Sequence, residues 1–461
     1  MRSFITLLLV RNIIYTCSLA QASSSLIADL QSLDLSPGTH IGLASNSSCF
    51  TQHWSSYDAP SYVAAVRPTT TRTLQKSSDM PQIHPHRFWP LAEAMDFRPP
   101  SIDCTNGIEL DLGHFNNVRV DTDTSGLTIG AAVRFRDVVG PLGGAQKELP
   151  IGSEPCVGII GATLGGGSVK LVTAAGDIIT ASTTENSDLF WGIRGAGFNY
   201  ATVLEATYTV FDQTAPSVLK CRFSFPVECQ IPAKLALVWL TAYDEALGGS
   251  FIMINAVYVG SQTEAQKYIQ PLIDASPVIS NLVMVPWSQV NAVALFAAES
   301  DNYTCPTNSP HNVYGVAVNY FDVPTFQTFY EEYATLTSSF ATELSGTVYF
   351  IEFFPKQAVQ AAAANATSYP WRNVTAHLLF DFAYNDTKGP LGDKIHAFAR
   401  EARSKFATVS GFEQPELYVS YCHGDEELAV LYSEEALPRL LDLKERWDPN
   451  NVYRYSYALI R

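Results

Sequence analysis

Three consecutive segments carry the glycines around which the chain is organised: 152-GSEPCVGIIGATLGGG-167, 169-VKLVTAAGDIITAS-182 and 188-DLFWGIRGAGFNYATV-203. Because glycine has no Cβ, backbone N–H groups in such turns can approach a ligand closely and point at its phosphates. The middle segment predicts a β-hairpin, in which Gly176 supplies the positive φ that its turn requires. The stretch therefore predicts a cofactor-holding core, with a glycine-rich turn on each side of a short hairpin.

The bulk composition indicates a folded, acidic protein with two domains. The chain has 461 residues, a length greater than one typical hydrophobic core accommodates, so two domains are expected. Of these residues 47% are hydrophobic and 16% charged, as in a folded protein. The net charge of −16 repels nucleic acid and anionic membranes, so neither is an expected partner. No stretch beyond the N-terminus is long and apolar enough for a stable membrane anchor, and the oligomeric state is left open.

The N-terminus and the glycosylation motifs predict secretion. Residues 1–22 combine a basic Arg2, apolar runs and the small-x-small end Ala20-Gln-Ala22, which is typical of a signal peptide; an amphipathic first helix is the alternative. We therefore expect a secreted or secretory-lumen glycoprotein. The sequons begin at Asn46, Asn302, Asn365, Asn373 and Asn385.

The cysteines predict at least one sulfur outside any internal disulfide. Cys17 leaves with the signal peptide and seven cysteines remain, an odd number. Cys221–Cys229 and Cys49–Cys104 are possible pairs. The apolar setting of Cys156 favours a small buried thiol. No cysteine spacing resembles a zinc site, so no metal is expected.

The pattern of apolar residues changes after residue 214. Before it, alternation predicts strands at 61–66 and 203–211 and, in one sheet, at 108–112, 116–120 and 127–133, with helices at 69–76 and 135–142. Residues 79–103 contain five prolines and no clear period, so we interpret them as an irregular loop. Further on, we expect strands at 251–259, 347–354, 376–384 and 416–421, and helices at 232–247, 263–274, 325–340, 393–406 and 428–446. These elements favour one sheet covered by helices on one side, which makes a wall for an apolar substrate.

Four blocks in order give a family resemblance. CVGIIGATLGGG, VKLVTAAGDIITAS, DLFWGIRGAGFNYATVLEATY and the final LKERWDPNNVYRYSYAL resemble FAD-linked oxidases of the vanillyl-alcohol-oxidase type, and within them the berberine-bridge-enzyme-like oxidases of fungal secondary metabolism. The resemblance implies an α+β fold. It has a two-lobed FAD-binding domain of the PCMH type at 58–212, completed by 426–461. A substrate-binding domain at 215–425 has an antiparallel sheet covered by helices.

The same resemblance implies which residues contact FAD. The first glycine turn would contact the pyrophosphate and the flavin ring, Ile179 the adenine end, and the second turn and the C-terminal tail would close over the cofactor. The expected set is Gly152, Cys156, Val157, Gly158, Gly161, Ala162, Gly165, Gly166, Ile179, Gly197, Asn199 and Tyr455.

The chain departs from the family where flavin is usually anchored. No Gly-Gly-Gly-His loop precedes Ile108, Glu154 stands where some members have a linking cysteine, and Gly167-Ser168 joins directly to the next strand. We therefore predict non-covalent or absent flavin, with a linkage through Cys156 as the alternative. One hypothesis is that residues 79–103 and the short join after Gly167 arise from a frame slip or a mispredicted splice junction; a divergent loop is the other.

Candidate catalytic residues lie in the second half of the chain. In similar oxidases a Tyr or Glu removes the substrate proton while flavin N5 takes the hydride, which points to Tyr418, Tyr421 and Glu352. A tyrosine base would need a pKa lowered by a cation or the flavin; structural aromatics and a partnered interior carboxylate are the alternatives. The resemblance implies an FAD-dependent oxidase that acts on a small, apolar secondary metabolite and is reoxidised by O₂. The alternatives are a cyclase-like enzyme or inactive remnant on this fold, or a non-catalytic secreted glycoprotein.

Overall fold

The computed structural model describes residues 27–28, 30–32, 35–43, 50–57, 59, 62–78, 87–91, 107–163, 167–223, 232–291, 305, 307–454 and 457–460. The expected signal peptide, the sequons at Asn46 and Asn302, and at least one cysteine of each suggested pair lie outside these ranges, as do Gly165, Gly166 and Tyr455. Among the described helices, none combines the length and the apolar character needed to cross a membrane.

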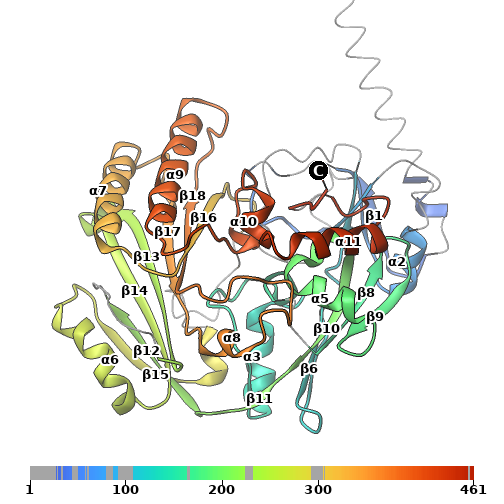
Figure 1. Ribbon diagram of the computed structural model, residues 1–461, viewed down its shortest axis with the longest axis horizontal. Coiled ribbons are helices and arrows are strands. Elements are labelled where there is room, and N and C mark those ends of the chain that lie inside the picture. Colours follow the sequence, from blue (N-terminus) through green and yellow to red (C-terminus); the bar gives the residue numbers. More distant parts are fainter. Residues whose placement is uncertain are drawn as a thin grey trace, which may run out of the picture.

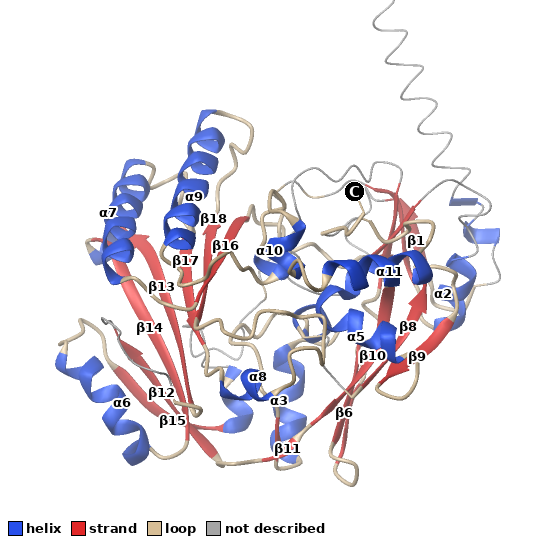
Figure 2. Cartoon of the chain, in the orientation of Figure 1, coloured by secondary structure: helices blue, strands red, loops and turns tan. Residues whose placement is uncertain are grey.

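Two sheets form the half of the molecule that contains the glycine turns (Figures 1 and 2). A four-stranded sheet has the order β1 (His40–Leu43), β2 (Tyr62–Arg67), β4 (Gly107–Asp111) and β3 (Arg87–Leu91), and β4 runs parallel to both of its neighbours. A five-stranded antiparallel sheet has the order β5 (Val118–Asp121), β6 (Gly126–Gly130), β10 (Ala201–Thr209), β8 (Ser168–Thr173) and β9 (Ile178–Ser182).

Helices and short elements complete this half. They are α2 (Thr71–Ser78), α3 (Phe135–Gly144), α4 (Ile159–Ala162), α5 (Ser187–Ala196), η3 (Gly197–Asn199), the paired β7 (Lys147–Glu148) and β11 (Phe211–Asp212), and the C-terminal α10 (Leu428–Tyr432) and α11 (Leu437–Trp447). In Figure 1 the C-terminal α11 lies along α5, although the two helices are far apart in the sequence.

The other half is a seven-stranded antiparallel sheet. Its order is β15 (Asn281–Pro286), β12 (Ser217–Phe223), β14 (Gly249–Val259), β13 (Leu235–Asp244), β17 (Val348–Phe353), β18 (Ala376–Phe382) and β16 (Asn312–Val318). The shorter elements here are η4 (Glu245–Leu247), η5 (Trp287–Gln289), α8 (Gln357–Ala361) and η7 (Val419–Tyr421).

Three helices cover one face of this sheet: α6 (Gln262–Asp274), α7 (Val323–Ser339) and α9 (Pro390–Thr408) (Figure 1). Alternate residues of β17, such as Tyr349, Ile351 and Phe353, are buried beneath them. Because side chains alternate along a strand, Phe350 and Glu352 lie on the opposite face. Glu352 therefore lies on the side of the sheet away from the three helices, where η7 packs against β16.

The α+β class, the hairpin with its turn at Gly176 (φ +88°) and the sheet covered by helices on one side are confirmed. Strands β2, β14, β17 and β18 and helices α2, α3, α6, α7 and α9 lie within a few residues of their predicted positions.

Several local predictions are wrong. The helix expected at 232–247 is instead the strand β13, followed by η4, and alternate residues of the strand are buried at Leu235, Leu237, Trp239 and Thr241. Residues 416–421 are not a strand and end in η7. The helix expected at 428–446 is interrupted at Ser433 (φ +60°). The strand β4 does not share a sheet with β5 and β6, and β3 lies inside the expected loop 79–103.

Candidate active site

The first glycine turn packs closely against its surroundings. A Cβ on Gly152 would lie 2.5 Å from the Phe135 ring, so only glycine fits there. The Asn291 side-chain amide donates to the Gly152 carbonyl over 2.9 Å. The turn continues into α4, whose first residue, Ile159, donates its N–H to the Val133 carbonyl over 3.0 Å. The loop is therefore held in place from both halves of the molecule.

The second glycine turn is fixed by the C-terminal tail. Gly195 has a φ of +158°, and a Cβ there would lie 2.5 Å from Ser368. Downstream, the fully buried Asn199 accepts from the Leu459 N–H over 3.0 Å and donates to the Tyr432 hydroxyl over 3.2 Å. The Asn199 side chain is thus held by the C-terminal part of the chain on both its oxygen and its nitrogen.

A buried ion pair reinforces the same junction. The Lys444 ammonium, with no exposed surface, donates to Asp448 over 2.6 Å and to the carbonyls of Asn199 (2.7 Å) and Tyr453 (2.6 Å). Burial lowers the pKa of Lys444, and the Asp448 carboxylate opposes this shift. The tail is therefore part of the structure that shapes the second turn.

The predicted catalytic residues Glu352 and Tyr421 lie in direct contact. The Tyr421 hydroxyl donates to Glu352 Oε2 over 2.5 Å, and the Ser153 hydroxyl donates to Glu352 Oε1 over 3.4 Å. Strand β17, η7 and the first glycine turn thus meet at one carboxylate. Burial raises the pKa of Glu352, against the hydrogen bonds from Tyr421 and Ser153.

Tyr418 joins the same cluster. Its hydroxyl donates to the Ala162 carbonyl at the end of α4 over 2.8 Å, and its ring centroid lies 5.1 Å from that of Tyr421. Burial raises the pKa of both tyrosines, and for Tyr421 the Glu352 charge adds to this shift. The lowered tyrosine pKa that a tyrosinate base would require is therefore not found.

The expectation that Cys156 is a free buried thiol is wrong. Its sulfur forms a disulfide with Cys305, with the two Cα atoms 5.6 Å apart and a separation of 149 positions in sequence. The sulfur is consequently neither a free thiol nor available to link a flavin. Cys422, in contrast, is a free and buried cysteine, in agreement with the odd cysteine count.

Two polar residues of the cluster were not predicted from the sequence. His377 on β18 lies directly across from Glu352 in the sheet, and Asn291 contacts the glycine turn. Asn291 Oδ1 and His377 Nδ1 are buried, and among the residues that the structure describes neither has a hydrogen-bond partner. For His377, the only available signal was a polar residue inside an apolar strand; for Asn291 there was none.

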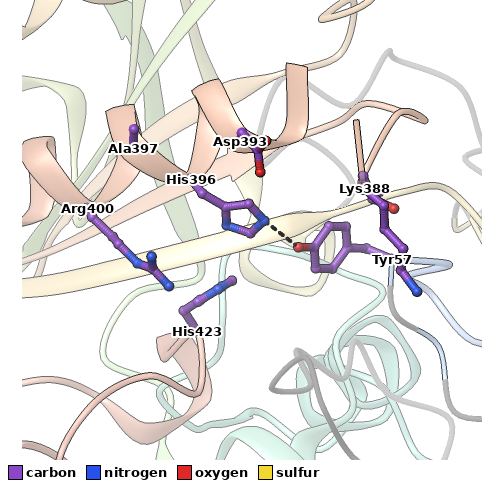
Figure 3. Close-up of a pocket in the computed structure, with 8 residues that line it drawn as sticks. Tyr57, Lys388, Asp393, His396, Ala397, Arg400 and His423 are labelled. Atoms are coloured by element: carbon purple, nitrogen blue, oxygen red, sulfur yellow. Dashed lines mark hydrogen bonds between the residues drawn. The ribbon is translucent and has the colours of Figure 1, made fainter. Parts of the chain in front are cut away.

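A separate cavity of about 450 Å³ lies beside α9 (Figure 3). The Tyr57 hydroxyl and His396 Nε2, which both line the cavity, share a hydrogen bond of 3.2 Å. The Arg400 guanidinium donates to Asp425 over 3.0 Å. His423 is buried and stacks on Tyr314, with the two ring centroids 3.9 Å apart. The lining consists of Tyr57, Thr387, Lys388, Asp393, His396, Ala397, Arg400 and His423. No residue of the glycine turns lines this cavity, so it is distinct from the cluster around Glu352.

Comparison with known proteins defines the class first. Residues 63–182 match a family model described as an FAD binding domain, which includes the first glycine turn and the hairpin. The FAD-linked oxidoreductase azaL of Aspergillus niger is 34% identical over 462 residues, covering 93% of this chain and 97% of the relative. The chain therefore belongs to the FAD-linked oxidoreductases, and its cofactor is FAD.

Solved structures give the same fold. The Physcomitrella patens BBE-like 1 protein matches with a TM-score of 0.78 at 18% identity, over 96% of this chain and 99% of that one. A xylooligosaccharide oxidase from Myceliophthora thermophila, solved with xylobiose, matches with a TM-score of 0.75 at 18% identity, over 95% and 99%. The resemblance to the berberine-bridge-enzyme-like fold is thereby confirmed.

The residues at the first glycine turn fit an FAD. Asn291 contacts Gly152 and His377 lies across from Glu352, and within the described ranges Asn291 Oδ1 and His377 Nδ1 are buried polar atoms that lack partners. A buried polar atom without a partner is costly, and the polar edge of a flavin or its substrate would satisfy it. The contacts of FAD with the individual predicted residues remain predictions.

Proposed function

We propose that the protein is an FAD-dependent oxidase that acts on a small, apolar molecule by hydride transfer and is reoxidised by O₂. The observation that carries this proposal is the hydrogen-bonded set of Ser153, Glu352 and Tyr421, which joins the FAD-binding turn to the open face of the seven-stranded sheet. FAD, when bound, supplies the two-electron acceptor, and O₂ then takes the electrons to give hydrogen peroxide.

The pKa directions favour a proton relay over a tyrosinate. Tyr421 takes the proton of the substrate's O–H or N–H group while its own hydroxyl proton passes to Glu352 Oε2. Tyr421 then carries no net charge, which matters because burial and the Glu352 charge both raise its pKa. The raised pKa of Glu352 makes this carboxylate a better proton acceptor than an exposed one. The substrate C–H bond breaks with its electron pair leaving as hydride.

The sheet face beside the relay supports an apolar substrate. Trp54, Val313 and Leu379 are buried together there, with Phe350 and Tyr421 packed against them. Val313, Leu379 and Phe350 belong to neighbouring strands and point to the same side as Glu352. Phe350 and Tyr421 are only partly buried, so an apolar ring system would pack against these two side chains on this face.

We further propose that the protein works outside the cytosol and is glycosylated. Asn365, Asn373 and Asn385 are exposed, as glycan attachment requires. The Cys156–Cys305 disulfide is typical of an oxidising compartment. Loss of the three glycans on enzymatic deglycosylation would appear as a mass decrease, whereas a secreted product of unchanged mass would contradict glycosylation.

The decisive experiment is anaerobic mixing of the purified protein with candidate substrates. We expect a yellow protein whose visible absorbance band bleaches with an alcohol or amine substrate and recovers when O₂ is admitted. We also expect acid precipitation to release the flavin into the supernatant, because Cys156 is in a disulfide. A colourless protein that takes up no FAD would refute the proposal. A yellow protein that converts a substrate without bleaching would favour the cyclase-like alternative.

A further inference from the structure

The strand register places His377 beside the proposed relay. On β18, His377 pairs with Glu352 of β17 on one side and with Ala317 of β16 on the other. Directly opposite residues in a sheet have their Cβ atoms about 5 Å apart and share a face. The imidazole therefore lies on the same face of the sheet as Glu352, opposite the face that α6, α7 and α9 cover.

Two tyrosine rings flank this imidazole: Tyr421 in η7 and Tyr418, the residue just before η7. The ring centroid of His377 is 5.9 Å from that of Tyr418 and 6.1 Å from that of Tyr421. Both tyrosine rings are roughly perpendicular to the imidazole, at 61° and 90°. His377 is thus enclosed by the groups to which the candidate chemistry is assigned.

Among the aromatic and imidazole rings of this cluster, that of His377 has unused hydrogen-bonding capacity. Tyr421 donates to Glu352, and Tyr418 donates to the Ala162 carbonyl. Within the described part of the chain, no hydrogen bond reaches either ring nitrogen of His377, and its Nδ1 is buried without a partner. The residue as a whole is only partly buried, so a ligand on the sheet face can reach the ring.

The charge state of His377 suits a neutral ligand. Burial lowers its pKa to about 4, so the ring is neutral at physiological pH. A neutral imidazole has one N–H donor and one lone pair, and can therefore both donate to and accept from a hydroxyl. A permanently charged ligand group would find no counter-charge on this residue.

We propose that His377 is a substrate-binding residue that hydrogen-bonds a hydroxyl group of the substrate. This inference rests on the proposed oxidase function and specifies its substrate class: an apolar molecule that carries a hydroxyl next to the Glu352–Tyr421 pair. The apolar surface around Leu379 and Phe350 holds the hydrocarbon part, while His377 selects for the hydroxyl and orients it.

The test compares benzyl alcohol with toluene, which lacks only the hydroxyl group. Binding to the FAD-loaded protein is measured from perturbation of the visible flavin band. We expect the wild type to bind benzyl alcohol about tenfold more tightly than toluene, the size of one hydrogen bond between neutral groups. His377→Phe should remove this preference, and His377→Gln, which keeps a donor and an acceptor, should retain most of it. His40→Phe, an exposed histidine on β1, is the matched control and should behave as the wild type.

A second readout does not depend on flavin or turnover. Diethyl pyrocarbonate acylates neutral imidazole, and at pH 5.5 an ordinary histidine is only about a tenth neutral. With its pKa of about 4, His377 is mostly neutral at that pH and should be modified early, as peptide mass spectrometry would show. Benzyl alcohol should protect it and toluene should not.

The outcomes separate this inference from the proposed function. Equal affinities of the wild type for the two probes, or an unchanged preference in a folded His377→Phe protein, would overturn the role of His377 even if substrates still bleach the flavin. Failure of every alcohol and amine to bleach the flavin would refute the oxidase. In that case, protection of His377 by benzyl alcohol would still support the hydroxyl-binding role.

Discussion

Replacing Lys444 with methionine tests whether the C-terminal tail holds the second glycine turn. The change removes an ion pair to Asp448 at 2.6 Å and the donor for the carbonyls of Asn199 and Tyr453. Breaking a buried pair from one side costs about 3–5 kcal/mol. Asp448 keeps two donors, the N–H groups of Val452 (2.7 Å) and Tyr453 (2.8 Å), so we expect the lower end, about 3 kcal/mol.

That loss is a large share of the roughly 5–15 kcal/mol that keeps a typical protein folded. Urea unfolding followed by tryptophan fluorescence measures it. Lys170→Met, an exposed lysine on β8, is the control and should change stability by less than about 0.5 kcal/mol. The double variant Lys444→Met/Asp448→Asn removes both charges and should recover part of the loss. A loss below about 1 kcal/mol, or no recovery in the double variant, would refute the reasoning.

Three further predictions concern the site. Tyr421→Phe should slow anaerobic flavin reduction by about 10²–10⁴-fold with little change in flavin content, because it removes the proton relay to Glu352; a change below about threefold would rule the relay out. The rate of flavin reduction should rise with pH, since only ionised Glu352 can accept the proton, and the midpoint should lie above the ordinary value of 4.5 because burial raises this pKa; a wild-type profile that is flat from pH 4 to 8 would contradict it. Cys305→Ser should lower the unfolding free energy by up to about 5 kcal/mol, the chain-entropy value for a loop of 149 residues; thermal melts unchanged from those of the wild type would show that the disulfide is not formed.

The sequence predicted those parts of the fold whose signals are local. The hairpin at Gly176 and the helices α6, α7 and α9 follow from turn chemistry and from the period of apolar residues. The strand β13 was mistaken for a helix because its alanines and leucines also suit one. Only pairing with β14 and β17 on either side decides the matter, and a single sequence does not show which strands pair.

In the candidate site, too, some residues could be predicted from the sequence, whereas the contacts between them could not. Glu352 and Tyr421 could be selected from the sequence because a Glu or Tyr near these positions acts as the base in similar oxidases. Their mutual contact, across 69 positions of the chain, does not follow from the sequence. The importance of His377 arises only from the register of β17 and β18. The role of Asn291 depends on a contact with Gly152, 139 residues away, which no local pattern records.

The disulfide between Cys156 and Cys305 has a consequence for producing the protein. It fastens the first glycine turn to a point far along the chain, so the turn reaches its final form only after both cysteines are synthesised and oxidised. The cytoplasm of an ordinary bacterial host keeps thiols reduced. Expression there would give a chain whose cofactor-binding loop lacks its cross-link, so a secreting yeast or filamentous fungus is the appropriate host.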